Sequence, residues 1–196
     1  NVYYFNKDYN FKIIDINKFL YKFHNIKKVF VKPSLEGLHQ VENASTAITA
    51  AMVLKKNNYN IKISSLGKSV YNTKWPGRIE RVKFKNKFII FDGSHNLLGA
   101  KKLNQYLKEQ HIRPNVIFGM LNNKKVYEFL SILKNNIDTL YPIKIPDEKN
   151  AYTQKEIYNI SKKIKLNSVI ISNFNYINRL LIKNSNKYIL ITGSLY

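Results

Sequence analysis

The sequence predicts an α/β fold, in which a Rossmann-like, mostly parallel sheet with helices on both faces follows a small β meander and helices. From Ile79 onward, short continuous apolar runs alternate with amphipathic stretches of helical length. This pattern is typical of strands that are buried on both faces and joined by helices. With 196 residues and no cysteine, the chain can bury a core without disulfides, and thiol nucleophiles and thiolate metal sites are excluded.

The first part of the chain, residues 2–32, predicts the β meander. Short runs of β-prone residues are separated by turn-rich residues and end before Pro33. The expected strands are Val2–Phe5, Phe11–Ile14 and Val29–Val31. Three short strands are too few to form a core by themselves, so we expect helices to cover them.

Two helices are expected after the meander. Small apolar side chains at helical spacing predict a helix that starts at Val41 and ends at Asn57. Ser64 or Ser65 can cap a second short helix, which is expected to run through Val70.

The sequence Trp75-Pro76-Gly77 cannot continue a helix, so we expect a domain boundary there. It divides the chain into domains 1–74 and 75–196. The strands expected in the second domain are Ile79–Phe84, Phe88–Phe91, Val116–Phe118, Thr139–Ile143, Val169–Ile171 and Tyr188–Ile191. The helices expected there are Gly99–Glu109, Val126–Lys134, Gln154–Lys165 and Phe174–Lys183.

A candidate ligand site follows the strand Phe88–Phe91. In parallel sheets ligands bind at the carboxyl ends of strands, and here the strand leads into Asp92, then Gly93, His95 and Asn96, before a helix. An aspartate at this edge can accept hydrogen bonds from ribose hydroxyls, and a helix start favours an anion. The alternative is that Asp92 and Asn96 only cap the helix.

Two further residues are candidates for ligand binding. Arg78 lies in the sharp turn at the start of the second domain, where its planar charge would suit a phosphate, or where it is simply a solvated residue of a hinge. Asn43 lies at the alanine-rich helix, either as its N-cap or as an amide that bonds a base or ribose.

Charge and motifs limit the other function classes. The net charge of +21 suggests a nucleic-acid partner, but only four of the basic residues are arginine, and base recognition favours arginine. We therefore attribute the lysine excess to A- and T-rich codons and expect no nucleic-acid partner.

Gly67-Lys68-Ser69 is not a P-loop, since Lys62 stands where its first glycine is needed. No apolar run is long enough for a membrane span, so we expect a cytoplasmic protein without membrane contact.

Four motifs occur in an order that resembles the folylpolyglutamate synthase / dihydrofolate synthase family of the Mur ligase superfamily. They are Gly37-Leu38-His39-Gln40-Val41-Glu42-Asn43-Ala44, Trp75-Pro76-Gly77-Arg78-Ile79-Glu80, Asp92-Gly93-Ser94-His95-Asn96 with Gly99-Ala100, and Thr192-Gly193-Ser194-Leu195-Tyr196. The resemblance covers the whole chain but only about the later half of the family pattern. Two departures are Ser94, where the family usually has Ala, and Leu97, where Pro commonly follows the asparagine.

The resemblance implies that residues 1–74 are the end of a central ATP-binding domain and that 75–196 are the C-terminal Rossmann-like domain. Asn43, Arg78 and Asp92 are then expected to contact ATP, with His95 near the phosphates or ribose, and Arg78 and His95 are the candidate catalytic residues. The P-loop, the Mg²⁺ ligands and most pterin contacts are expected in the preceding half of the protein, so no metal ligand is assigned in this chain.

The activity implied is ATP-dependent addition of L-glutamate to folate or dihydropteroate through an acyl phosphate. The expected partners are these substrates and the protein's own N-terminal half, in a monomer that is inactive as this fragment alone. The alternatives are a Mur-type peptide ligase, against which the motifs at Arg78 and Ser194 argue, and a non-catalytic basic module that binds a nucleotide or RNA.

Overall fold

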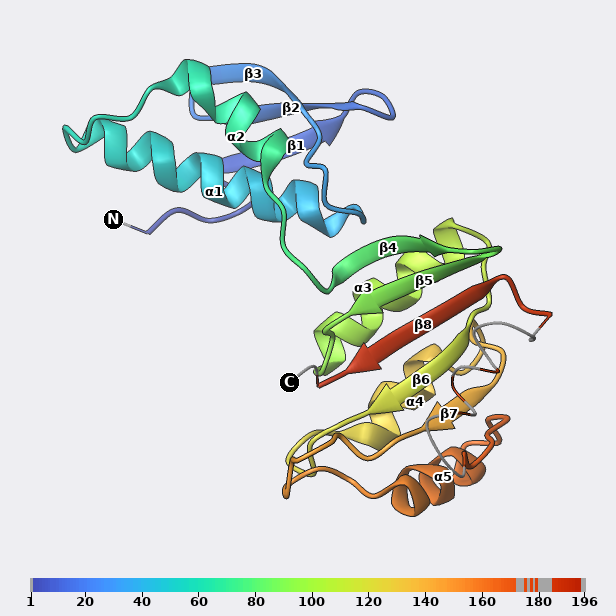
Figure 1. Cartoon of the computed structure of the whole chain (residues 1–196). Coiled ribbons are helices and arrows are strands. Elements are labelled where there is room, and N and C mark those ends of the chain that lie inside the picture. Colours follow the sequence, from blue (N-terminus) through green and yellow to red (C-terminus); the bar gives the residue numbers. More distant parts are fainter. Residues whose placement is uncertain (1, 172–174, 176, 178, 180–184, 195–196) are drawn as a thin grey trace. The chain divides into compact units, whose positions relative to one another are not determined.

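The chain folds into two compact units, Asn1–Trp75 and Pro76–Tyr196, in a computed structural model that describes residues 2–171, 175, 177, 179 and 185–194. Within the described residues, no helix combines the length and the hydrophobicity that crossing a membrane requires. We call the two parts unit 1 and unit 2 (Figure 1).

Unit 1 is an antiparallel three-stranded meander covered by helices on one face. Its elements are β1 (Tyr9–Ile13), β2 (Lys18–Phe23), β3 (Ile26–Val31), α1 (His39–Lys56), a short 3-10 turn (Ile63–Ser65) and α2 (Leu66–Asn72). Aromatic side chains at alternate positions of β2, Phe19, Tyr21 and Phe23, are buried in the core that the meander forms with the helices. The hydroxyls of Tyr21 and Thr49 of α1 lie 2.7 Å apart, within this core.

The meander differs from the prediction in which residues form its strands. Val2–Phe5 is not a strand, because the carbonyl of Tyr4 accepts from the backbone N–H groups of Lys7 and Asp8 and the chain turns there. The central strand is instead β2, which is not among the strands expected from the sequence. Its aromatic residues occupy every second position, which is the pattern of a strand with one buried face.

Unit 2 contains a five-stranded sheet with the order β4-β5-β8-β6-β7. Its strands are β4 (Arg78–Phe84), β5 (Lys87–Asp92), β6 (Asn115–Gly119), β7 (Leu140–Pro142) and β8 (Tyr188–Gly193). The neighbouring strands β5, β8, β6 and β7 run parallel to one another, and β4 pairs antiparallel with β5 at one edge. The mostly parallel sheet predicted from the sequence is therefore confirmed, with β8 inserted between β5 and β6 (Figure 1).

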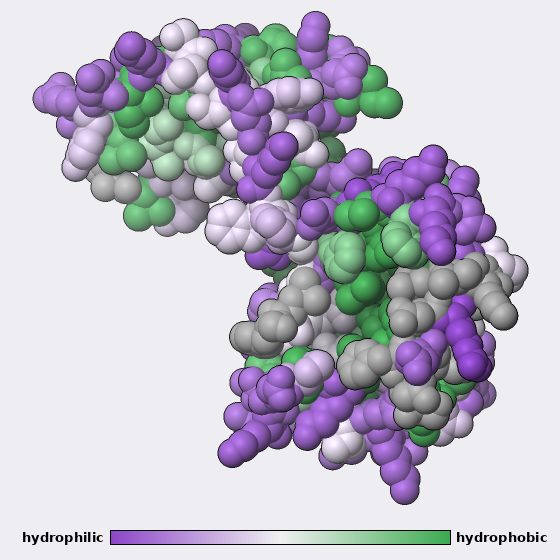
Figure 2. Space-filling view, viewed as in Figure 1, coloured by the Kyte–Doolittle hydropathy of each residue, from purple (hydrophilic) through white to green (hydrophobic). Residues whose placement is uncertain are grey.

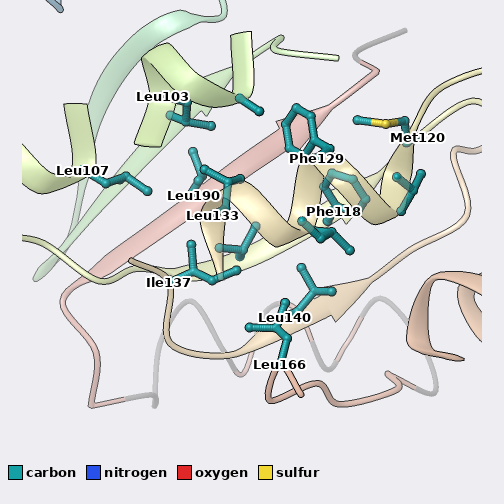
Figure 3. Packing of buried hydrophobic residues seen from close by; sticks show 14 of the residues in the cluster. Leu103, Leu107, Phe118, Met120, Phe129, Leu133, Ile137, Leu140, Leu166 and Leu190 are labelled. Atoms are coloured by element: carbon teal, nitrogen blue, oxygen red, sulfur yellow. The ribbon is translucent and has the colours of Figure 1, made fainter. Parts of the chain in front are cut away.

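Among the residues that the structure describes, this unit contains the helices α3 (Leu97–Glu109), α4 (Val126–Leu133) and α5 (Gln154–Lys163). Leucines of α3 and α4 join Phe118 and Leu190 of the sheet in one buried cluster (Figure 3). A second cluster surrounds Ile117 and Ile189, which are the sequence neighbours of Phe118 and Leu190. Because successive side chains of a strand point to opposite faces, this cluster lies on the other face of the sheet. The predicted helix Phe174–Lys183 falls largely outside the described residues.

The predicted strand Val169–Ile171 is wrong. A single bridge joins Ser168 to Leu140 of β7, with backbone hydrogen bonds from Leu140 to Asn167 and from Val169 to Leu140. The next donor on this side of β7 would be residue 142, which is a proline without an N–H group. The ladder therefore stops after one bridge.

Candidate functional site

The carboxyl end of β5 brings Asp92 opposite Arg78, the first residue of β4. Asp92 is only 3% exposed, whereas Arg78 is exposed to solvent. A buried carboxylate and an exposed guanidinium thus lie at the same edge of the sheet, where ligands of open α/β sheets bind.

The carboxylate of Asp92 is held from two sides. The backbone N–H of Ile79 donates to Oδ2 at 3.2 Å, and that of Ser94 donates to Oδ1 at 3.0 Å. Burial raises the pKa of Asp92 above its ordinary value, while hydrogen bonds from Ser94 and Ile79 and the charge of Arg78 act in the opposite direction. The carboxyl group therefore depends on these neighbours to remain ionised.

The turn before β4 fixes this geometry through an unusual backbone. Gly77 has φ 69°, and its carbonyl accepts from the N–H of Gly93 at 2.8 Å. Its N–H donates to Glu80 Oε2 at 3.0 Å. Ile79, a β-branched residue, has φ 51°, and the β4–β5 register shifts between Arg78 and Glu80. A positive φ at such a residue is strained, so the hydrogen bond from Ile79 to Asp92 holds a conformation the chain would otherwise avoid.

His95 follows in the loop between β5 and α3 and is exposed. Its Nδ1 lies 2.9 Å from the carbonyl oxygen of Gly93. Because a carbonyl can only accept, Nδ1 carries a proton, and in the neutral ring Nε2 is left as the acceptor. The imidazole is thus oriented at the edge that also holds Asp92.

Asn96 is the N-cap of α3, since its side chain accepts from the N–H of Gly99 at 2.8 Å. The capping alternative is therefore correct for Asn96 and wrong for Asp92, whose oxygens accept from Ile79 and Ser94 instead. Capping of α3 therefore explains the presence of Asn96 but not that of Asp92.

Asn43 belongs to unit 1 and is exposed within α1. The helix begins at His39, so the interpretation of Asn43 as its N-cap is wrong. The residue before the helix, Leu38, makes no side-chain capping bond. The Asn43 amide donates to Gln40 Oε1 at 3.0 Å, and the other predicted site residues, Arg78, Asp92 and His95, all lie in unit 2.

The end of β8 completes the carboxyl edge of the sheet in unit 2. Gly193 has φ 123°, and a Cβ there would lie 1.8 Å from the carbonyl oxygen of Gly119, so only glycine fits. Thr192, in register with Asp92, is buried, and its hydroxyl has no hydrogen-bond partner among the described residues. A cavity of about 110 Å³ lies near these strand ends, lined by residues that include Gly119, Ile143 and Ser194.

The chemistry available at this edge is binding and charge neutralisation. Asp92 supplies a carboxylate and Arg78 a permanent cation. His95 supplies an imidazole whose Nδ1 is fixed as a hydrogen-bond donor by the Gly93 carbonyl. Within the described part of the chain, His, Asp and Glu side chains form no group of three that could hold a metal ion. The described residues therefore do not fit a Mg²⁺ site.

Sequence reasoning missed two residues that shape the site, Ser94 and Gly99. Ser94 is notable in the sequence only as a departure from a family pattern, yet its backbone N–H donates to Asp92 Oδ1. A glycine inside a helical pattern is a signal of close packing, and a Cβ on Gly99 would lie 2.8 Å from Ser94 Oγ.

The fold and this edge define unit 2 as a Rossmann-like α/β domain with polar groups at the carboxyl ends of its strands. The model of the family described as "Mur ligase, glutamate ligase domain" matches residues 77–195. The chain therefore belongs to this family of ligases, as the four motifs indicated.

Known proteins agree with this assignment. The chain is 32% identical over 174 residues to the dihydrofolate synthase/folylpolyglutamate synthase of Bacillus subtilis, a match that covers 85% of this chain and 39% of the relative. It is similar in fold to Escherichia coli FolC in complex with DHPP and ADP, with a TM-score of 0.78 at 17% identity over 96% of this chain and 43% of that one. A folylpolyglutamate synthase of Thermotoga maritima gives a TM-score of 0.75 at 23% identity, over 98% of this chain and 45% of that one. The chain spans 36% to 42% of the length of the curated relatives it matches.

Proposed function

We propose that this chain is the later part of an ATP-dependent ligase that joins L-glutamate to folate or dihydropteroate. The observation that carries the proposal is the buried carboxylate of Asp92 beside Arg78, at the carboxyl edge of a glutamate ligase domain. The B. subtilis relative is named a dihydrofolate synthase/folylpolyglutamate synthase, and the E. coli neighbour was solved with DHPP and ADP. Both names support the same substrates for this chain.

The reaction would proceed in two steps. A substrate carboxylate attacks the γ-phosphorus of ATP, which forms an acyl phosphate and releases ADP. The amine of L-glutamate then attacks the acyl carbon, forms the amide and releases phosphate, with loss of the amine protons to solvent or a base. Arg78 would offset charge on the transferring phosphoryl group, Asp92 would accept from a ribose hydroxyl, and His95 would contact the phosphates or ribose.

Mg²⁺ would neutralise phosphate charge in such a reaction. Because the described residues of this chain do not form a metal site, we place the metal ligands in the portion that the relatives have and this chain does not. We assign no step of the mechanism to a metal held by this chain.

Unit 1 is proposed to be the end of the central ATP-binding domain, with Asn43 as a nucleotide contact. One face of α1 supports this, because Asn43, Ala47, Ala50 and Leu54 follow one another at helical spacing and are all exposed. In Figure 2 the surface over α1 is partly hydrophobic. Such a face suits packing against the N-terminal half of the same ligase, which is the partner we propose.

The proposal is tested by fusing the chain behind the N-terminal portion of the B. subtilis relative. We expect ADP release that requires both L-glutamate and a folate or dihydropteroate acceptor. Comparison of the two acceptors also assigns the substrate. A folded fusion that binds ATP but releases no ADP on addition of glutamate would contradict the ligase function and favour a non-catalytic nucleotide-binding module.

A further inference from the structure

Glu80 closes the turn in which Arg78 lies, at the start of β4. Its carboxylate Oε2 accepts from the backbone N–H of Gly77 at 3.0 Å, which forms a ring around Arg78 and Ile79. The carbonyl of Gly77 accepts from the N–H of Gly93 at 2.8 Å, so Gly77 is held through both of its backbone polar groups. On the other side of Arg78, the N–H of Ile79 donates to a buried carboxylate at 3.2 Å. The backbone of Arg78 is therefore fixed from both sides.

Glu80 does not neutralise Arg78, although the two residues are only two positions apart. Among the described residues, the guanidinium of Arg78 makes no hydrogen bond and no ion pair. The other arginine of β4 differs, because the guanidinium of Arg81 lies 5.3 Å from the ring centre of Phe88. The Glu80 carboxylate is thus engaged by a backbone donor, and the Arg78 cation remains available to an anionic ligand at the carboxyl edge of the sheet.

We propose that Glu80 is a positioning residue, which fixes the turn through the Gly77 N–H and so directs the Arg78 guanidinium toward the transferring phosphoryl group. The inference rests on the proposed role of Arg78 in the ligase reaction. Arg78 stands between Gly77 with φ 69° and Ile79 with φ 51°, and a backbone of this shape needs support from its surroundings. Because a displacement of about 1 Å can cost about a hundredfold in rate, a hydrogen bond that fixes this turn matters for catalysis even though it is exposed.

The first measurement follows the Gly77 N–H in the 196-residue chain. The chain has seven glycines, so labelling with ¹⁵N-glycine gives a small set of amide signals. The Gly77 signal is assigned by its loss in Gly77→Asn, since asparagine tolerates a positive φ. We expect Glu80→Ala to speed the exchange of this N–H with water by about fivefold, and Glu80→Gln, which keeps an acceptor oxygen, to preserve the slower exchange. Equal exchange in Glu80→Ala and the unchanged chain would overturn the proposal.

The second measurement is steady-state ADP release by the fusion protein. We expect Glu80→Ala to lower kcat roughly tenfold with little change in KM for ATP, because the Arg78 charge acts on the transferring group. Glu80→Gln should restore turnover, since its amide oxygen can accept from Gly77. Glu109→Ala is the matched control and should leave kcat unchanged, because Glu109 is an exposed glutamate of unit 2 that accepts from Gln105 at 2.8 Å.

A double variant of the fusion protein separates positioning from a general structural effect. If Glu80 acts through Arg78, adding Glu80→Ala to Arg78→Ala should cause no further loss of kcat, whereas independent effects multiply. Multiplied effects, or an unchanged kcat in Glu80→Ala alone, would overturn the positioning role and leave the ligase function intact. Absence of ADP release from the fusion with Glu80 and Arg78 unchanged would instead overturn the proposed function, and this role with it.

Discussion

The backbone N–H of Ile79 donates to Asp92 Oδ2 at 3.2 Å, which links a residue with φ 51° to a buried carboxylate. Each group stabilises an unfavourable state of the other. The carboxylate holds Ile79 in a backbone region that β-branched residues avoid, and Ile79 supplies a donor to a charge removed from water. Strain and burial at one point of a strand end are typical of binding sites.

The raised pKa of Asp92 predicts a pH-dependent stability. The folded protein binds a proton at Asp92 more tightly than the unfolded chain, whose carboxyl titrates near 3.8. The stabilising effect of this proton is therefore complete below the unfolded pKa and is lost as pH rises through the raised, folded pKa. Urea unfolding from about pH 3 to about pH 7 measures it. The unfolding free energy of the unchanged protein minus that of Asp92→Asn should fall through this window and then stay constant. A difference that rises with pH would contradict the assignment.

Gly193→Ala should be among the most damaging single substitutions in unit 2. The new Cβ would lie 1.8 Å from the Gly119 carbonyl oxygen, and the residue would keep φ 123°. We expect a loss of at least about 3 kcal/mol in unfolding free energy, measured by urea unfolding. The control is Gly67→Ala in α2, where the Cβ would meet only Phe30 Cδ1 at 3.7 Å. That change should be neutral or stabilise by up to about 1 kcal/mol, and equal effects of the two substitutions would refute the argument.

Gly99→Ala should destabilise unit 2 although it improves helix propensity. Alanine is favoured over glycine in a helix by about 1 kcal/mol, but here its Cβ would overlap Ser94. Overpacking of this kind costs about 1 to 3 kcal/mol, so we expect a net loss in urea unfolding. A gain in stability like that expected for Gly67→Ala would show that the contact between residues 94 and 99 is loose.

Arg78→Ala should impair turnover of the fusion protein far more than Arg81→Ala does. Both residues are exposed arginines of β4, so the two variants change the net charge equally. Arg78 lies opposite Asp92 in the register of β4 and β5, whereas the guanidinium of Arg81 lies 5.3 Å from the ring centre of Phe88. Removing a cation that stabilises a transferring phosphoryl group should lower kcat by roughly a hundredfold or more, in a steady-state assay of ADP release. Equal kcat in both variants would show that Arg78 has no specific role in turnover.

Much of unit 2 was predictable because its signals are local. The apolar run before Asp92 and the helix after Asn96 follow from hydrophobic periodicity and capping, and they place Asp92 at the carboxyl edge. The strand expected at Val169–Ile171 failed because Pro142 of a neighbouring strand ends the ladder, which no local pattern reveals. The close approach of Gly99 to Ser94 is local in sequence, but its distances depend on how the loop enters α3.

The most direct test of the account is glutamate-dependent ADP release by the fusion protein with Asp92→Asn. The substitution keeps the size of the side chain but removes the charge and one acceptor, so it should raise KM for ATP and lower kcat/KM by roughly a hundredfold. Circular dichroism would establish that the variant folds. ADP release at the unchanged rate and with the unchanged KM would contradict the claim that the Asp92 carboxylate serves the nucleotide in glutamate ligation.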